Sequence, residues 1–104
     1  MTELISVIIA NYNRSALLGK AIESIINQKS DVSFLWEIII VDDWSTDDSR
    51  VLIEQYMASY PENIRAIYQQ NQGVNVARNI GINALSELSA YVIILDNDDE
   101  ITPW

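Results

Sequence analysis

A dense group of acidic residues stands near the end of this 104-residue sequence. The apolar run Val92–Leu95 leads directly into Asp96-Asn97-Asp98-Asp99-Glu100. Carboxylates packed this closely repel one another unless a cation or water compensates them. Hard oxygen ligands at this density suit Mg²⁺ or Mn²⁺, and the sequence has no cysteine or histidine to favour a softer metal. We therefore expect a divalent cation here, with Glu100 in solvent. The alternative is solvated loop charge that also caps a following helix.

A second acidic pair, Asp42 and Asp43, follows the apolar run Glu37–Val41. Adjacent carboxylates at the end of a strand have no evident packing purpose, so we expect them to bind a ligand. A carboxylate can accept a hydrogen bond from a ring N–H, such as that of uracil. Asp47 and Asp48 are instead explained as residues at the N-terminus of a helix.

Three further positions can recognise a flat ring. Tyr12 follows the first apolar run and can lie against a base, while backbone groups near Ala10 meet the edge of the base. Arg78 is one of only six basic residues and lies in the first turns of a predicted helix that begins after Gly73. The alternatives are a polar loop in which Asn13 caps the next helix, and an ordinary surface arginine at position 78.

Short apolar runs that alternate with longer amphipathic stretches must position these residues. The runs are rich in isoleucine and valine and predict strands buried on both faces: Ile5–Ala10, Glu37–Val41, Ile64–Tyr68 and Tyr91–Leu95. The order β-α-β-α-β-α-β predicts one Rossmann-like, three-layer α/β domain with a mostly parallel sheet. Ligands bind such sheets at the carboxyl ends of the strands, which is where all the candidate residues lie.

The predicted helices are read from apolar residues at helical spacing. The three stripes are Leu17, Leu18, Ala21, Ile22, Ile25 and Ile26; then Leu52, Tyr56 and Tyr60; then Val74, Ala77, Ala84, Leu85 and Leu88. Ser45 and Asp48 resemble a capping box for the second helix. Gly81 costs its helix about 1 kcal/mol relative to alanine, so we expect it to allow close packing.

The composition excludes several classes of function. Fifteen acidic against six basic residues give a formal net charge of −9, which argues against a nucleic-acid partner. The only glycines are Gly19, Gly73 and Gly81, so neither a G-x-x-x-x-G-K-[ST] nor a G-x-G-x-x-G phosphate motif is present. No apolar run is long enough to span a bilayer, and Met1–Ala10 lacks the features of a signal peptide. We expect a cytoplasmic location, with peripheral membrane contact in a full-length protein.

A nucleoside diphosphate would use all of these strand ends together. The base would meet Tyr12, Asp43 and Arg78. The diphosphate and the acidic cluster repel each other, so a divalent cation must bridge them.

At this point the sequence resembles the N-terminal, nucleotide-binding part of the family 2 glycosyltransferases, which have the GT-A fold. The matching stretches are SVIIANYNR (6–14), EIIIVDDWSTDDS (37–49), NQGVNVARNIGIN (71–83) and YVIILDNDD (91–99). The resemblance implies transfer of a sugar from a nucleotide-sugar, most often UDP-linked, to a hydroxyl of a saccharide or lipid-linked acceptor, as in polysaccharide biosynthesis.

The resemblance also implies roles for particular residues. Ala10, Tyr12, Asp43 and Arg78 would line the base pocket. In the D-x-D element, Asp96 would meet the ribose and the metal, and Asp98 the metal, with Asp99 as a rival ligand. The metal, Mn²⁺ or Mg²⁺, would stabilise charge on the departing diphosphate.

Two departures from the family accompany this resemblance. Trp44 stands where the family usually has glycine, and its ring would either crowd the base pocket or lie outward. The chain also stops at Trp104, soon after the acids, whereas the family's acceptor-binding half and general base follow its D-x-D. We expect residues 1–104 to be a truncated part of a catalytic domain that is inactive alone. An uncovered fourth strand would then allow self-association.

Two other classes fit parts of the pattern. A metal-dependent phosphoryl-transfer or Toprim-like α/β domain also gathers acids at strand ends, but usually has a key acid after the first strand, where this chain has Asn11-Tyr12-Asn13. In a non-catalytic binding module the acids would be surface charge. UDP binding that requires Mn²⁺ and is lost in Asp98→Ala would favour the glycosyltransferase over both.

Overall fold

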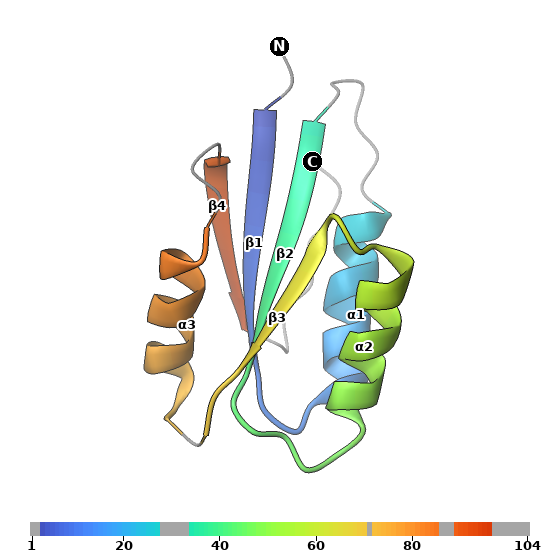
Figure 1. The fold of residues 1–104 in the computed structure, drawn as a ribbon, viewed down its shortest axis with the longest axis vertical. Coiled ribbons are helices and arrows are strands. Elements are labelled where there is room, and N and C mark those ends of the chain that lie inside the picture. Colours follow the sequence, from blue (N-terminus) through green and yellow to red (C-terminus); the bar gives the residue numbers. More distant parts are fainter. Residues whose placement is uncertain (1–2, 28–33, 71, 86–88, 97–104) are drawn as a thin grey trace.

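The computed structural model describes residues 3–27, 34–70, 72–85 and 89–96. The elements follow the predicted order (Figure 1): β1 (Glu3–Asn11), α1 (Ser15–Ile26), β2 (Phe34–Asp42), α2 (Ser49–Ser59), β3 (Ile64–Tyr68), α3 (Val74–Asn83) and β4 (Ser89–Asp96). The bounds predicted for β3 are matched, and the other three strands extend beyond the predicted apolar runs. None of the described helices is long and apolar enough to cross a membrane.

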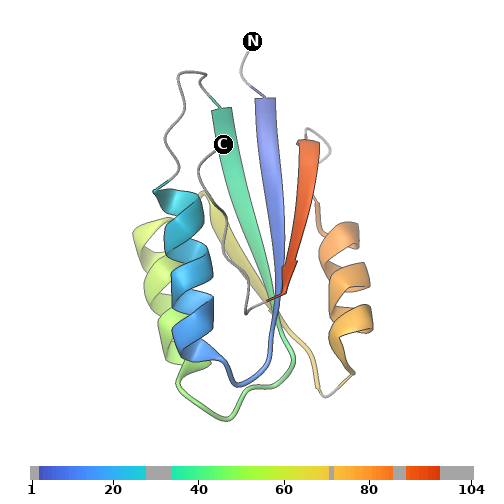
Figure 2. The same cartoon turned by 180° about the vertical axis from the view of Figure 1, so that it is seen from behind.

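The four strands form one parallel sheet in the order β3-β2-β1-β4, visible from both sides in Figures 1 and 2. β1 is a central strand: Val7 pairs with Ile38 of β2 and with Ile93 of β4. Val7, Ile8 and Ile9 are all fully buried, as are four consecutive residues of β2, Ile38–Val41. Both faces of these strands are covered, which explains why their sequences are continuous apolar runs rather than alternating ones.

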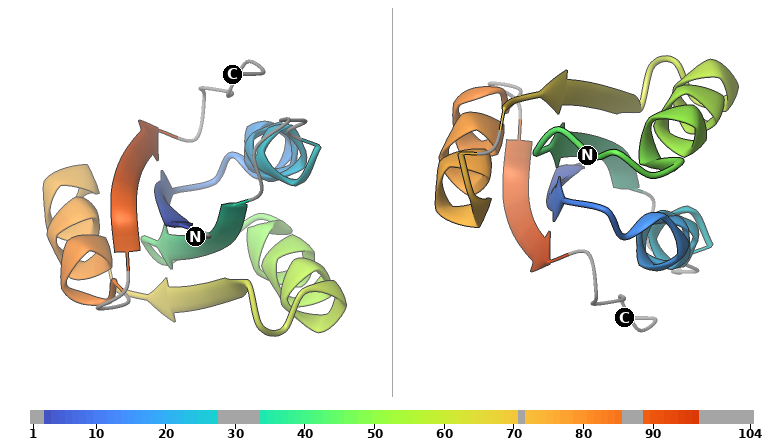
Figure 3. Two further views of the ribbon diagram at one scale, coloured as in Figure 1. Left: turned by 90° about the horizontal axis from the view of Figure 1, so that it is seen from above. Right: turned by 90° about the horizontal axis from the view of Figure 1, so that it is seen from below.

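Helices cover the sheet on both faces, with α1 and α2 on one side and α3 on the other (Figure 3). The larger core cluster lies under α1 and α2 and comprises Val7, Ile9, Leu18, Ala21, Ile22, Ile25, Ile38, Ile40, Ile53, Ile64 and Leu95. The smaller lies under α3 and comprises Ala10, Ile39, Val41 and Ala77. Ile53 is the fully buried apolar residue of α2, which the predicted stripe on that helix omitted.

Helix α3 packs very closely on β1 at Gly81. A Cβ atom at this position would collide with Cγ2 of Ile8, so the expected packing role of this glycine is confirmed. The predicted third stripe was too long, since α3 ends at Asn83. Ala84 and Leu85 lie beyond the helix but still pack against the smaller core, and Leu88 lies outside the described residues.

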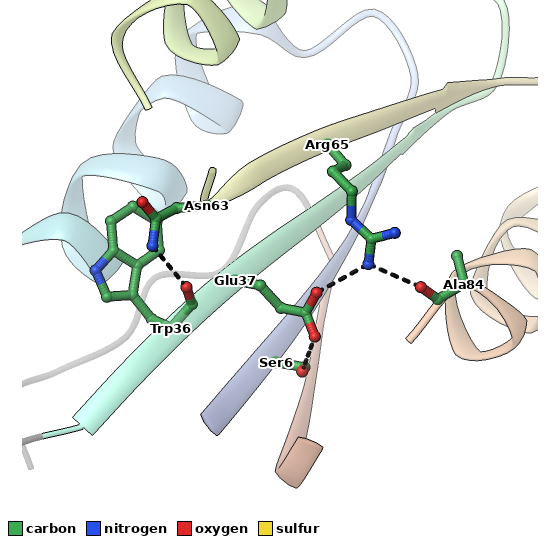
Figure 4. A network of polar contacts seen from close by, with 6 residues as sticks. All are labelled: Ser6, Trp36, Glu37, Asn63, Arg65 and Ala84. Atoms are coloured by element: carbon green, nitrogen blue, oxygen red, sulfur yellow. Dashed lines mark hydrogen bonds and ion pairs between the residues drawn. The ribbon is translucent and has the colours of Figure 1, made fainter. Parts of the chain in front are cut away.

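A buried carboxylate joins three strands in the amino-terminal half of the sheet (Figure 4). Glu37 of β2 accepts a hydrogen bond from Oγ of Ser6 at 2.5 Å and forms an ion pair with Arg65 of β3 at 2.8 Å. The same Arg65 nitrogen donates to the carbonyl of Ala84 at the end of α3, also at 2.8 Å. A cation at this position offsets the negative end of the helix dipole, so Arg65 ties α3 to the sheet.

Candidate functional site

The carboxyl ends of the four strands lie in one row, at the lower edge in Figure 1. The register places Asp96 of β4 beside Ala10 of β1, Asn11 beside Asp42 of β2, and Asp42 beside Tyr68 of β3. We call this edge, with the loops that follow β1, β2 and β3, the carboxyl rim. Because β4 pairs with β1 instead of β3, the topological switch point lies between β1 and β4, where parallel α/β sheets bind ligands.

Asp42 is a structural residue of the carboxyl rim. Its carboxylate is fully buried and accepts hydrogen bonds from Nδ2 of Asn11 at 2.8 Å, from the backbone N–H of Ser45 at 3.0 Å and from Oγ of Ser45 at 2.6 Å. The expectation that the Asp42–Asp43 pair has no packing purpose is therefore wrong for Asp42. Its charge is compensated by local donors that also shape the loop after β2.

Asn13 joins the loop after β1 to the loop after β2. Its φ of 50° is in the left-handed region, which asparagine tolerates better than most residues. Its Oδ1 accepts from the backbone N–H groups of Thr46 at 2.6 Å and Asp47 at 3.2 Å, and its own N–H donates to Oγ of Ser45 at 2.9 Å. The alternative that Asn13 caps α1 is wrong: the N-cap is Arg14, without a side-chain capping bond.

Asp47 serves the beginnings of two helices at once. Its carboxylate accepts from the N–H of Ser15, the first residue of α1, at 3.2 Å and from the N–H of Ser49, the first residue of α2, at 2.9 Å. Burial raises the pKa of Asp47, but the hydrogen bonds from Ser49 and Ser15 outweigh it, and the net pKa is lowered. Its predicted role at a helix N-terminus is confirmed. The Ser45–Asp48 capping box is wrong, because Asp48 makes no capping bond.

Asp43 holds the loop between β3 and α3. Its Oδ1 accepts from Nε2 of Gln69 at 3.0 Å and from the N–H of Gln72 at 2.8 Å, and its Oδ2 accepts from the N–H of Gly73 at 3.1 Å. Gly73 has a φ of 88°, which favours glycine, and it immediately precedes α3. The candidate acid for base binding thus also fixes the start of the helix that carries Arg78.

Trp44 lies against a cation, in a conformation unusual for a bulky residue. Its φ is 62°, which explains why glycine is the easier choice at this position. The guanidinium of Arg50 lies over the Trp44 ring at 4.3 Å and over the Tyr68 ring at 4.6 Å. Cation–π contacts on this scale stabilise by about 0.5–1 kcal/mol each at exposed sites. Arg50 therefore fixes the ring, which is 40% exposed, on the α2 side of its loop.

For the other candidate residues, the structure describes the side chain of some, only the backbone of others, and nothing of the rest. Tyr12 follows β1 directly and its side chain is 49% exposed, whereas Ala10 is buried at the end of the strand. Arg78 lies in α3 and Asp96 ends β4, but only their backbone is described. Asp98 and Asp99 lie outside the described residues. The rim thus brings together Ala10, Tyr12, Asp43 and the backbone of Asp96.

Comparison with known proteins decides the family. Residues 6–104 match the family described as Glycosyl transferase family 2. The chain belongs to this family. It is 38% identical over 96 residues to the minor teichoic acid biosynthesis protein GgaA of Bacillus subtilis (strain 168), covering 92% of this chain and 22% of GgaA.

Solved structures agree on the GT-A fold. Residues 1–349 of S. aureus TarS in complex with UDP superpose with a TM-score of 0.75 at 25% identity, covering 96% of this chain and 28% of TarS. The mannosyltransferase PcManGT of Pyrobaculum calidifontis, solved with GDP-Man and Mn²⁺, superposes with a TM-score of 0.77 at 22% identity. The match covers 92% of this chain and 28% of PcManGT. The chain therefore spans only about a quarter of the length of these relatives.

Proposed function

We propose that this chain is the nucleotide-sugar-binding part of a glycosyltransferase, which uses a UDP-linked sugar and a divalent cation for transfer to an acceptor hydroxyl. The observation that carries the proposal is the pairing of Ala10 with Asp96 across the switch point, beside the loops that hold Tyr12 and Asp43. Membership of the family and the UDP complex of TarS support a uridine nucleotide.

Within this proposal the base lies against Tyr12 and Ala10, and its ring N–H donates to Asp43. Arg78 completes the base pocket, and Asp96 binds the ribose. Tyr12 suits this role because its ring is exposed and its position follows a rigid, buried strand. Asp43 suits it because its carboxylate is oriented by three donors and still has acceptor capacity.

The divalent cation is proposed to bind Asp98 and Asp96, with Asp99 as the alternative ligand. The donor set fits Mn²⁺ or Mg²⁺, since the sequence supplies hard carboxylate oxygens and has neither histidine nor cysteine. When bound, the cation would supply Lewis-acid stabilisation of the departing diphosphate. The residues of this chain would hold the nucleotide and keep the cation beside it.

Calorimetric titration of the chain with UDP, with and without Mn²⁺, tests the proposal. We expect UDP binding to require Mn²⁺, to be lost in Asp98→Ala and to weaken at least tenfold in Asp43→Asn. Glu54→Gln, an exposed acid of α2, is the matched control and should bind normally. Mn²⁺ binding that is indifferent to UDP would favour a phosphoryl-transfer domain, and binding of neither would favour a non-catalytic module.

The acceptor site and the general base are proposed to lie outside residues 1–104, because the relatives are about four times longer. Sugar transfer by this chain alone would contradict that part of the proposal. The cytoplasmic location, with peripheral membrane contact in a longer protein, also stays a prediction.

Self-association of the chain through β4 likewise stays a prediction. Val92 and Ile94 of this strand are 45% and 43% exposed, which supports it. A sedimentation coefficient that does not change with concentration would contradict it.

A further inference from the structure

Gln69 lies immediately after β3 and is almost fully buried, with 6% of its surface exposed. Its Nε2 donates to Oδ1 of Asp43 at 3.0 Å and to the carbonyl of Gly73 at 3.2 Å. Its Oε1 is buried and has no hydrogen-bond partner among the described residues. A buried amide left half-satisfied costs stability. An apolar side chain would fill this position without burying an unpaired oxygen. We therefore expect the role of the glutamine to come from the two hydrogen bonds that its Nε2 donates, to Asp43 and to the carbonyl of Gly73.

The Asp43 carboxylate has about four acceptor positions, two on each oxygen. Gln69 and the N–H of Gln72 occupy both positions on Oδ1, and the N–H of Gly73 occupies one on Oδ2. Counting donors from the described residues alone, one acceptor position remains, on Oδ2. If Gln69 were absent, Oδ1 would regain a position and the carboxylate could offer both oxygens side by side.

We infer that Gln69 is a positioning residue that sets the base selectivity of the nucleotide site, by leaving Asp43 a single acceptor position. This inference rests on the proposed function. Uracil presents one ring N–H between two carbonyl oxygens and matches a single acceptor. Guanine presents a ring N–H beside an amino group and is best met by both carboxylate oxygens, whereas cytosine presents an acceptor at the same ring position and is repelled. The Gln69–Asp43 pair therefore selects uridine over guanosine and cytidine nucleotides.

The test is the affinity of the 104-residue chain for UDP and for GDP, each measured with Mn²⁺, in wild type and in Gln69→Met. Methionine has a volume similar to that of glutamine, and it has no amide oxygen that needs a hydrogen-bond partner. We expect the melting temperature to change little, the UDP affinity to fall about tenfold because the Asp43 carboxylate loses a donor that orients it, and the preference for UDP over GDP to fall by at least as much. Gln55→Met, an exposed glutamine of α2, is the matched control.

A second variant, Gln69→Glu, keeps the size of the side chain but places a carboxylate against Asp43. We expect it to lose UDP binding more completely than Gln69→Met while its circular dichroism stays that of a folded chain. An unchanged preference for UDP over GDP in Gln69→Met, or an equal loss of both affinities together with a lower melting temperature, would overturn the inference. Failure of wild type to bind either nucleotide would instead overturn the proposed function, and this inference with it.

Discussion

The buried and partly buried acids at the two ends of the sheet are compensated in different ways. In the amino-terminal half, Glu37 is paired with a cation, Arg65. At the carboxyl rim, Asp42 and Asp43 receive only neutral donors, and the described residues contain no ion pair to either acid. A cation therefore neutralises Glu37, whereas the donors at the rim stabilise the carboxylates of Asp42 and Asp43 without cancelling their negative charge. A rim of this kind attracts cations and N–H donors, which are what the proposed ligand brings.

The largest expected effect comes from removing the buried acid of the rim. Asp42→Ala removes the carboxylate that accepts from Nδ2 of Asn11 and from the N–H and hydroxyl of Ser45, so we expect the free energy of unfolding to fall by about 3 kcal/mol. Urea denaturation measures this loss. The exposed Asp48→Ala should change the free energy by less than about 0.5 kcal/mol. Equal losses in the two variants would show that Asp42 does not hold the loops together.

Breaking the ion pair between Glu37 and Arg65 should lower the free energy of unfolding by less, because half of the Arg65 side chain is exposed. Arg65→Met is expected to cost about 1–2 kcal/mol, since it leaves the charge of Glu37 buried and also removes the bond to Ala84. Adding Glu37→Gln removes that charge but keeps an acceptor for Ser6. The double variant should therefore be more stable than Arg65→Met. A double variant that is less stable would contradict the difference drawn between the two ends.

The smallest effect concerns Asp47, a rim acid held by backbone N–H groups near the surface. Its pKa is lowered in the folded state, so its contribution is present above the ordinary value of 3.8 and is lost as the pH falls through the folded pKa. We expect Asp47→Asn to cost a few tenths of a kcal/mol at pH 7 and nothing at about pH 2. Stability measured against pH from 2 to 7 tests this. A loss that persists at pH 2 would point to packing instead of charge.

The sequence was sufficient for the fold because its strands are buried on both faces. Ile38, Ile39 and Ile40 leave few alternatives to a strand in a parallel sheet, and Gly81 in a helical stripe correctly indicated a close contact. The different roles of Asp42 and Asp43 could not be predicted from the sequence. Asp42 takes a donor from Asn11 and Asp43 takes one from Gln69, and both donors are distant in the sequence and reach the acids only in the fold.

The same limit explains the missed contacts of Asn13, Gln69 and Trp44. A local pattern indicated a helix cap for Asn13, but the loop after β2, more than 30 residues further along the chain, offers its amide better partners. Gln69 carries no motif of its own, and its importance follows from burial with one unpaired oxygen. For Trp44, the deciding neighbour Arg50 is the second residue of α2, and the same guanidinium also lies over Tyr68 of β3.

The strand order has a consequence for how the chain folds. β1 is synthesised well before β4, which pairs with one of its two edges, so Val7 can meet Ile93 only after all the intervening residues have been synthesised. Contacts between residues so distant in sequence form slowly. During that interval the open edge of a largely apolar strand can pair with any other extended chain. A nascent chain halted before Ser89 is therefore expected to aggregate or to occupy a chaperone, however well its first three strands are formed.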